Sequence, residues 1–437
     1  MAKYRFLIFT ILLIFSKKAI SQQEVGLHFM DIWQTSKTNP AYVAEQKFIV
    51  GLPQLHLNYY NTGGAFNSLI VDYLGDDNSI QVGNTLDKLD EFDNRLRGVL
   101  EIETINLGYR LGKIQLGFSH AQKTNLYMSF PRTLANLFFE GNGQYIGQTV
   151  PLDHDIHLTS YNEFGLSGAI ELSKLTVGAR VKYLTGIANA YVDRNQISLF
   201  TDSDVYQLTL NTDYRLNTSS LIDGDDLSSF SLSLGGLNFN ELITKNSGVA
   251  IDLGVTYQVS EQLKVAASII DLGTINWSEN VENYASQGST TYEGFDFTQF
   301  VEDDSVSFDS ALDTLQNSFD FEETSDGYST NLPTKIYLSA SYQLNKMLRL
   351  GGLFYNEIYE GESFPIFALS ANAKLTDLVS VGGVYSGRKG SLFNLGINFA
   401  VKLGPAQLFG TTDNITAVFR PYESANVNFR TGVNLLF

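Results

Sequence analysis

The chain has 437 residues and a formal net charge of −18, and this charge excludes a protein that holds nucleic acid on a basic surface. It contains no cysteine, which excludes disulfides, thiolate metal sites, thiol catalysis and the acylated cysteine of a lipoprotein. The 37 glycines, 23 tyrosines and 30 phenylalanines, beside only 8 prolines, argue against a set of soluble β-domains joined by prolyl turns.

Residues 1–21 have the organisation of a secretory signal peptide. Lys3 and Arg5 precede an apolar run over residues 6–15, and residues 19–21 read Ala-Ile-Ser, a small-x-small cleavage site. The alternative is an uncleaved anchor helix, but the run is about half the length that crosses a bilayer. No later run of about 18 apolar residues follows. We therefore expect either a secreted or periplasmic protein or an outer-membrane barrel.

Residues 425–437 carry the clearest strand pattern. One parity is apolar except for a threonine, and it comprises Val427, Phe429, Thr431, Val433, Leu435 and Phe437. The other parity is polar or small except for Leu436. A strand sends alternate side chains to opposite faces, so the pattern predicts the closing strand of a transmembrane barrel, with lipid outside and a polar lumen inside. We assign Val433, Leu435 and Phe437 to barrel assembly, and Phe437 resembles the C-terminal aromatic by which such barrels are handed to the insertion machinery.

The same two-residue alternation recurs along the chain, over residues 105–118, 175–183, 206–210, 249–259, 336–344 and 393–403. Short polar turns alternate with long connections over residues 131–155, 217–246 and 278–331. This asymmetry is typical of bacterial outer-membrane barrels. A soluble β-sandwich is the alternative, but its strands are usually only about 5–6 residues long. We predict an all-β fold, a transmembrane antiparallel β-barrel of about 14 strands.

The residues between the signal peptide and the first strand fit neither pattern. Residues 22–46 include Trp33 and several other apolar side chains, and we predict a periplasmic or plug-like segment that inserts in part into a barrel formed by residues 47–437. Helical spacing predicts short loop helices within residues 84–97 and 131–139, the second beginning at a proline.

Two stretches raise the question of metal binding. Thirteen acidic residues and no basic one lie between Trp277 and Lys335, which suits either divalent cations that bridge to lipopolysaccharide or a solvated loop, and we favour the loop. Asp153, His154, Asp155 and His157 form the densest cluster of ligand types, but residues three apart on a strand face opposite ways. We therefore predict no metal site and no cofactor.

No catalytic arrangement is apparent either. Ser167 lies in a strand pattern without the spacing of a nucleophile elbow, and residues 386–391 resemble a phosphate loop only in composition. We predict a protein that is not an enzyme. The parity that would face the lumen instead carries charges, which are Arg110, Arg180, Lys182, Asp252, Lys264, Lys335, Arg349, Lys402 and Arg430. They predict an interior of ion pairs or a narrow polar passage.

Asn39, Pro40 and Ala41 begin a series of motifs that covers nearly the whole mature chain. The others lie at residues 47–53, 141–145, 161–164, 178–186, 268–273, 331–333 and 403–408. Together they resemble a Bacteroidota family of outer-membrane β-barrels with no assigned function, related to the PorV, PorP/SprF and FadL-type proteins. The resemblance implies a barrel of about 14 strands with an N-terminal plug. It transfers no ligand-binding residue to this chain.

These observations leave two functional hypotheses for a protein of the Gram-negative outer membrane. The first is an accessory or scaffold barrel that works with protein partners in secretion, surface attachment or envelope assembly. The alternative is a FadL-like channel for uptake of a hydrophobic small molecule, which predicts a bulged strand and an apolar pocket behind the N-terminal segment. The partners that we expect in either case are outer-membrane lipid, lipopolysaccharide and the barrel-insertion machinery, and no nucleic acid.

Overall fold

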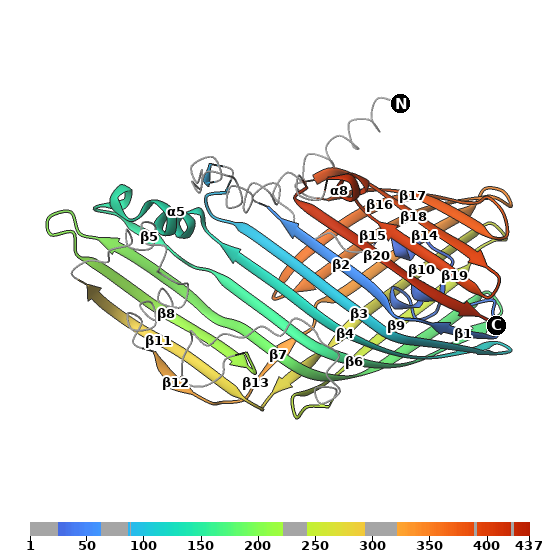
Figure 1. Cartoon of the computed structure of the whole chain (residues 1–437), viewed down its shortest axis with the longest axis horizontal. Coiled ribbons are helices and arrows are strands. Elements are labelled where there is room, and N and C mark those ends of the chain that lie inside the picture. Colours follow the sequence, from blue (N-terminus) through green and yellow to red (C-terminus); the bar gives the residue numbers. More distant parts are fainter. Residues whose placement is uncertain are drawn as a thin grey trace.

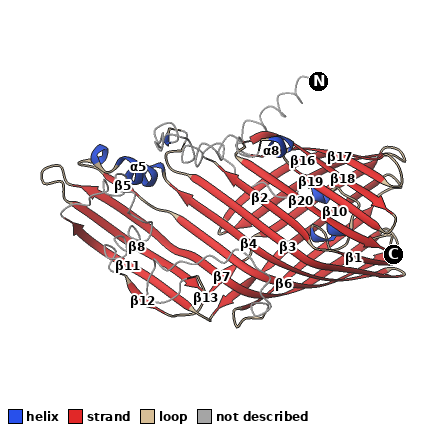
Figure 2. Ribbon diagram, viewed as in Figure 1, coloured by secondary structure: helices blue, strands red, loops and turns tan. Residues whose placement is uncertain are grey.

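The computed structural model describes residues 25–62, 86–87, 89–221, 243–292, 321–388, 391–420 and 424–437, and it shows a closed antiparallel β-barrel (Figure 1). Long tilted strands dominate, and the helices are short (Figure 2). The predicted signal peptide lies outside the described residues. In the part of the chain that the structure describes, no helix is both long and apolar enough to cross a membrane.

The wall contains fourteen antiparallel strands, each of which we call a stave, and this confirms the predicted fold class. Two staves are each made of two labelled strands, because Pro53 interrupts the first and Pro333 the eighth. In order, the staves are β1 (Phe48–Gly51) with β2 (Gln54–Asn61), β3 (Asn94–Leu111), β4 (Ile114–Phe130), β6 (Asp155–Leu172), β7 (Leu175–Thr201), β9 (Ser247–Gln258), β10 (Leu263–Trp277), β13 (Tyr328–Asn331) with β14 (Thr334–Gln343), β15 (Leu348–Tyr359), β16 (Glu362–Lys374), β17 (Val379–Arg388), β18 (Ser391–Leu403), β19 (Ala406–Thr412) and β20 (Asn426–Leu436). The last stave closes on the first, because Leu435 pairs with Val50 and Thr431 pairs with Leu55.

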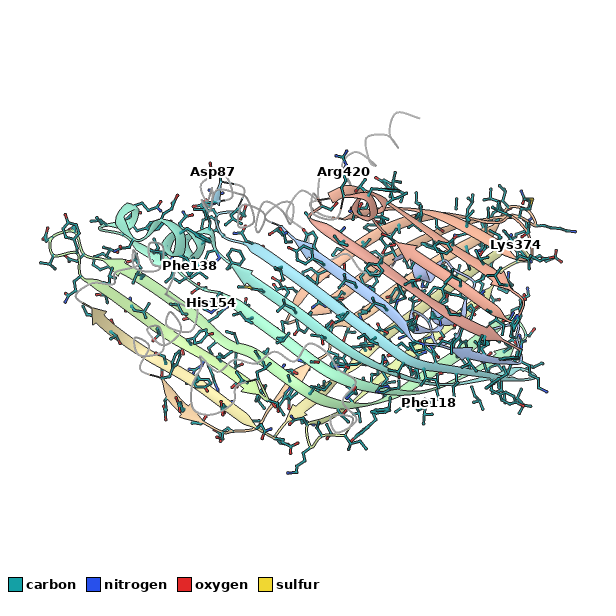
Figure 3. All side chains as sticks on the ribbon, viewed as in Figure 1. Asp87, Phe118, Phe138, His154, Lys374 and Arg420 are labelled. Carbon is teal, nitrogen blue, oxygen red and sulfur yellow. The ribbon has the colours of Figure 1, made fainter. Side chains whose placement is uncertain are left out.

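The two faces of the wall differ as the sequence alternation predicts. Leu166 and Val181 point outward and are 66% and 58% exposed, whereas Arg180 and Asp252 point inward and are buried. Phe118 projects from the outer surface of β4 (Figure 3). Apolar side chains exposed around a closed barrel form the band that contacts lipid tails in barrels of this kind.

Short turns join the staves at one end of the barrel, where Lys374 lies (Figure 3). The turn between β3 and β4 contains Gly112 at φ 59°, a left-handed conformation that glycine adopts without steric cost. The opposite end carries longer connections that include α5 (Arg132–Glu140), η3 (Gly143–Tyr145), β5 (Thr149–Pro151) and α8 (Ile415–Phe419). Short turns of this kind face the periplasm in bacterial barrels, so this asymmetry sets the orientation.

Strand β7 is longer than the barrel wall. Its first part pairs with β9, and from Asn189 onward it pairs with β8 (Leu208–Ser219) instead. Strand β8 pairs with β11 (Val281–Tyr292), and β11 pairs with β12 (Glu322–Thr324). We call β8, β11 and β12 the extension; it lies at the left of Figure 1. The predicted barrel strand at residues 206–210 is therefore wrong, because residues 208–210 belong to β8 of the extension, and the predicted loop over residues 278–331 contains strand β11.

One predicted loop helix needs correction. Residues 84, 85 and 88 lie outside the described residues and Leu86 is helical, but the end of the predicted helix is a strand, because β3 begins at Asn94 and Arg97 pairs with Tyr60 on one side and with Tyr127 on the other. Pairing on both sides outweighs a local apolar period. The second predicted helix is present as α5, and it ends before Gly141, whose φ is 74°.

Residues 25–46, which we call the plug, lie inside the barrel at the end with the short turns. They contain α2 (Val25–His28) and η1 (Trp33–Lys37). Leu27 is fully buried and packs in a cluster with Phe409, while Trp33 packs in a second cluster with Ile49. The apolar side chains that made a free segment implausible are thus covered by the wall.

Candidate functional site in the barrel lumen

Trp33 sits on two glycines of the wall. Gly108 and Gly117 pair across β3 and β4, and a Cβ atom built on either would lie 3.0 Å from the indole ring. The indole Nε1 donates a hydrogen bond to Asn106 Oδ1 at 2.6 Å. Any side chain at either glycine would push the ring away. These small lumen-facing residues are therefore a seat for the plug.

The motif Asn39-Pro40-Ala41 is seated in the same manner. Gly178 and Gly254 pair across β7 and β9, and Cβ atoms built on them would collide with Pro40 and with Asn39. Asn39 Oδ1 accepts a hydrogen bond from the Ala41 N–H at 2.9 Å, so the Asn39 side chain shapes its own turn. The motif thus acts as a docking point between the plug and the wall.

Polar anchors hold the rest of the plug. The Asp413 carboxylate accepts hydrogen bonds from the N–H groups of Val25 and Gly26, at 3.0 and 2.8 Å. Arg349 on β15 forms an ion pair with Asp31, Nη1 to Oδ2 at 2.8 Å. Anchors from two separate parts of the wall therefore hold the plug.

A cavity of about 60 Å³ remains between the plug and the wall. One water needs roughly 10–15 Å³ of such volume, so the cavity has room for a few waters. Its charged lining comprises six cations and three carboxylates, which are Lys37, Lys123, Arg180, Lys182, Lys335, Arg430, Glu101, Glu163 and Asp271. Val99, Ile270 and Tyr337 contribute apolar surface.

Lys182 is the centre of the ion pairs on one side of the cavity. Its Nζ lies 2.8 Å from Asp252 Oδ1 and 3.6 Å from Glu163 Oε2, and it also pairs with Asp271. Asp271 Oδ2 lies 2.6 Å from the Nζ of Lys335. Charges buried in a barrel cost several kcal/mol each unless they are paired, so these groups must be held together.

Glu101 is the centre of the ion pairs on the other side. Arg430 Nη2 lies 2.8 Å from Glu101 Oε2, and Lys37 of the plug pairs with Glu101 and with Glu103. Lys123 Nζ lies 2.6 Å from Glu163 Oε2, and Lys123 is the strand-pairing neighbour of Glu101, so it lies between the two sides. The plug therefore contributes one cation to a network that the wall otherwise supplies.

Strand β10 is irregular where it meets this network. Its pairing with β9 shifts between Ile269 and Leu272, and Asp271 has φ 61°. The Asp271 N–H bonds to Asp252 Oδ1 at 2.8 Å instead of to a backbone carbonyl. On its other side, Pro333 separates β13 from β14 at the same height. The backbone ladder is thus interrupted on both sides of β10, beside the cavity.

Polar rows of side chains continue from the cavity toward the far mouth. Residues paired in register lie on the same face of a sheet, so each row can be read from the strand pairing. The first row above the charges is Asn428, Asn58, Val99, Asn125, Thr159 and Asn189, and the next is Asn426, Tyr60, Arg97, Tyr127, His157 and Tyr191. The lumen is therefore polar along its length on this side.

The lumen charges predicted from parity divide into two groups. Arg180, Lys182, Asp252, Lys335 and Arg430 converge around the cavity, while Arg110, Lys264, Arg349 and Lys402 lie near the short turns. Sequence reasoning missed Lys37, Glu101, Lys123, Glu163 and Asp271. Lys123 and Glu163 face the lumen by ordinary alternation and could have been found, whereas the β3 pairing shifts between Glu103 and Ile105 and reverses the parity at Glu101. Asp271 could not be found either, because the β10 bulge turns it inward.

The other stretches considered for chemistry do not come together. His154 Nδ1 donates a hydrogen bond to the Leu152 carbonyl oxygen at 3.1 Å, and burial lowers the pKa of His154. His157 packs against the rings of Tyr127 and Tyr191. Among the described residues no group of three metal-ligating side chains is found. Most of the acidic stretch, residues 293–320, lies outside the described residues, as do residues 389–390 of the loop at 386–391.

The predicted assembly residues lie on the last stave. Val433 and Leu435 are half-buried on the outward face of β20, and Phe437 is 61% exposed with its ring centroid 6.2 Å from that of Phe48. Together with the motif at residues 39–41, they occupy the same end of the barrel.

The chain is similar to several known proteins. Residues 40–413 match the sequence model of a family of unknown function, DUF5723. No curated protein matches the sequence. Among solved structures, the toluene transporter TbuX of Ralstonia pickettii is 10% identical, with 93% of this chain and 94% of that chain covered and a TM-score of 0.42. A FadL homologue of Pseudomonas aeruginosa is 10% identical, with 94% and 96% covered and a TM-score of 0.44.

Proposed function

The chain belongs to the DUF5723 family, and because that family has no assigned function, we propose one from the lumen. The protein is an outer-membrane channel, closed at rest by its plug, for a small molecule that has an apolar body and an anionic end. The observation that carries this proposal is the lining of the cavity.

The balance of charge at the cavity favours an anion. Asp252 and Glu103 pair with the same cations as the three lining carboxylates, so six cations meet five carboxylates and one positive charge is in excess. A carboxylate of a bound molecule would complete the pairing with little rearrangement of the protein, since the cations are already held in place.

The apolar part of the lining favours an amphipathic molecule over a simple anion. Ile270 and Tyr337 line the cavity and also belong to an apolar cluster with Phe29 of the plug. The hydrophobic-channel hypothesis predicts a bulged strand and an apolar pocket. Strand β10 has the bulge, but the cavity is lined mainly by charged side chains. The cargo that suits this lining is apolar at one end only, and because the resting cavity has room for only a few waters, the plug must move when the cargo binds.

Binding of octanoate and octanol to the protein in lipid nanodiscs tests this proposal. We expect octanoate to bind and octanol to bind much more weakly, because only octanoate supplies the missing negative charge. Lys335→Gln removes one cavity cation and should weaken octanoate binding about tenfold, as loss of one charged hydrogen bond does. Lys374→Gln, in an exposed turn, is the matched control and should change nothing. Equal binding of the two probes, or binding of neither, would overturn the proposal.

A second candidate function is an accessory barrel that acts through protein partners. It is favoured by the close fit of the plug, which rests on paired glycines and is anchored by Asp413 and Arg349. The extension also offers surface beyond the wall for a secretion or surface protein. Crosslinking and co-purification from native membranes test this reading. A stoichiometric partner together with no octanoate binding would favour it, and recovery of the barrel alone would count against it.

A further inference from the structure

The turn between β15 and β16 makes contacts across the lumen. These strands are the ninth and tenth staves, and β3 and β4 are the second and third, so the two pairs lie on opposite sides of a fourteen-stave barrel. Residues 357–362, which we call the latch, nevertheless touch β3, β4, β6 and β7. The latch therefore crosses the lumen at the end opposite the plug.

Two ion pairs hold the latch to β3. Arg95 makes a bidentate pair with Glu362, Nη1 to Oε2 at 2.5 Å and Nη2 to Oε1 at 2.9 Å. Arg97 Nη2 lies 3.0 Å from Glu357 Oε1, and both side chains are buried. Glu357 also accepts a hydrogen bond from the Tyr355 hydroxyl at 3.1 Å. Bidentate pairing fixes both the distance and the orientation of the partners.

Aromatic contacts extend the attachment to three further strands. The Tyr359 ring packs edge-on against Tyr127 and His157, with centroids 6.1 and 5.7 Å apart, and the Arg97 guanidinium lies 5.5 Å above it. The Tyr191 hydroxyl donates to Glu360 Oε2 at 3.3 Å. One hairpin tip is thus bound by four consecutive staves of the facing wall.

We propose that the latch is an extracellular gate. It closes the lumen above the cavity, and it opens by moving as one hairpin away from β3. The pairing of β15 with β16 is continuous up to Tyr359 and Glu362, so the hairpin can move without breaking its own ladder. Its attachments are charged or amphipathic groups at the mouth, and water can solvate both members of each ion pair once they separate.

The proposal concerns regulation of the proposed channel and rests on that function, but its test does not use the cargo. The chain has no cysteine, so Val99→Cys places one thiol in the cavity below the latch. A sulfonated maleimide that cannot cross membranes is added to intact cells, and the rate of labelling reports access from outside. Heat-modifiable migration on gels shows that each variant is folded.

We expect slow but complete labelling with the native latch. Arg95→Ala should raise the rate about tenfold or more, because it removes a bidentate charged pair. The exchanged pair Arg95→Glu with Glu362→Arg should restore the slow rate. Arg194→Ala breaks an ion pair with Asp213 that does not cross the lumen, and it is the matched control with no expected change.

Two results would overturn the gate. Equal labelling rates with the latch intact and broken would show that the latch does not close the cavity. Labelling of the Arg95→Ala variant but never of the native latch would show a permanent brace and not a gate. Because octanoate is absent throughout, failure of this test is distinguishable from failure of the proposed cargo.

Discussion

At the scale of single residues, the plug and the wall are matched to each other through glycines. Trp33 lies over Gly108 and Gly117, and the Pro40 backbone lies over Gly178. A strand interior normally loses stability at glycine, because the residue has no side chain to pack and a large entropy to lose. In this wall the plug supplies the missing packing. The wall is therefore fully packed at these glycines only when the plug is in place.

Gly108→Val tests this match. The new side chain would meet the Trp33 ring at close range, so we expect the indole to leave its seat and the protein to lose about 1–3 kcal/mol of stability through overpacking. Iodide quenching of tryptophan fluorescence should increase, while Trp277, the other tryptophan, stays buried. Gly168→Val is the matched control, since a Cβ there meets only Leu116 at an ordinary 3.9 Å. Unchanged quenching in Gly108→Val would contradict the seat.

At the scale of elements, β10 joins the wall to the charged network. Its bulge leaves the backbone ladder incomplete, and the Asp252 carboxylate accepts the freed Asp271 N–H, while the Asp271 carboxylate pairs with Lys182 and Lys335. An irregular strand is tolerated in a membrane only where protein or a polar cavity satisfies the freed groups. The ion pairs therefore stabilise the bulge, and the bulge in turn aims Asp271 into the lumen.

The substitution Asp271→Asn tests whether the ion pairs stabilise the bulge. It leaves the buried Lys182 and the partly buried Lys335 short of a counter-charge, and removal of one member of a buried pair costs about 3–5 kcal/mol. Adding Lys335→Gln removes one of those lysines, so the double variant should be more stable than the sum of the single effects, with a coupling of about 1–3 kcal/mol. Urea unfolding in lipid vesicles measures both, with exposed Asp377→Asn as the unaffected control. Strict additivity would refute the network.

The same elements show which features of the fold and the site could be predicted from the sequence. Alternation was sufficient for the staves, the short turns and the inward direction of Arg180, Lys182 and Arg430, because a regular strand has a fixed period. It failed at Asp271, where a bulge reverses the parity, and at β8, whose alternating residues pair in the extension. It also gave no means of knowing that Arg95 and Glu362, 267 residues apart, meet across the lumen. Such contacts depend on how the closed wall brings distant staves together.

At the scale of the whole molecule, the lumen is closed twice. The plug occupies the end with the short turns, the latch crosses the other end, and the charged cavity lies between them. The last stave holds this arrangement in place, because β20 pairs with β1 and β2 and its Asn434 bonds to Gln34 of the plug at 2.6 Å. The last strand therefore takes part both in barrel closure and in holding the plug.

Because the two closures act in series, they lead to a prediction about ion conductance. Ion flow through two constrictions in a row is limited by the tighter one, so opening either closure alone should leave the current in planar bilayers near the native level. We expect Arg95→Ala alone, which loosens the latch, and Gly108→Val with Gly178→Val, which displaces the plug from both glycine seats, to remain nearly silent. The three substitutions together should give clear channel openings, because the hydrated rows between the closures then connect both sides. If either set alone conducted as well as the combination, one of the two closures would be no barrier, and the current would identify which.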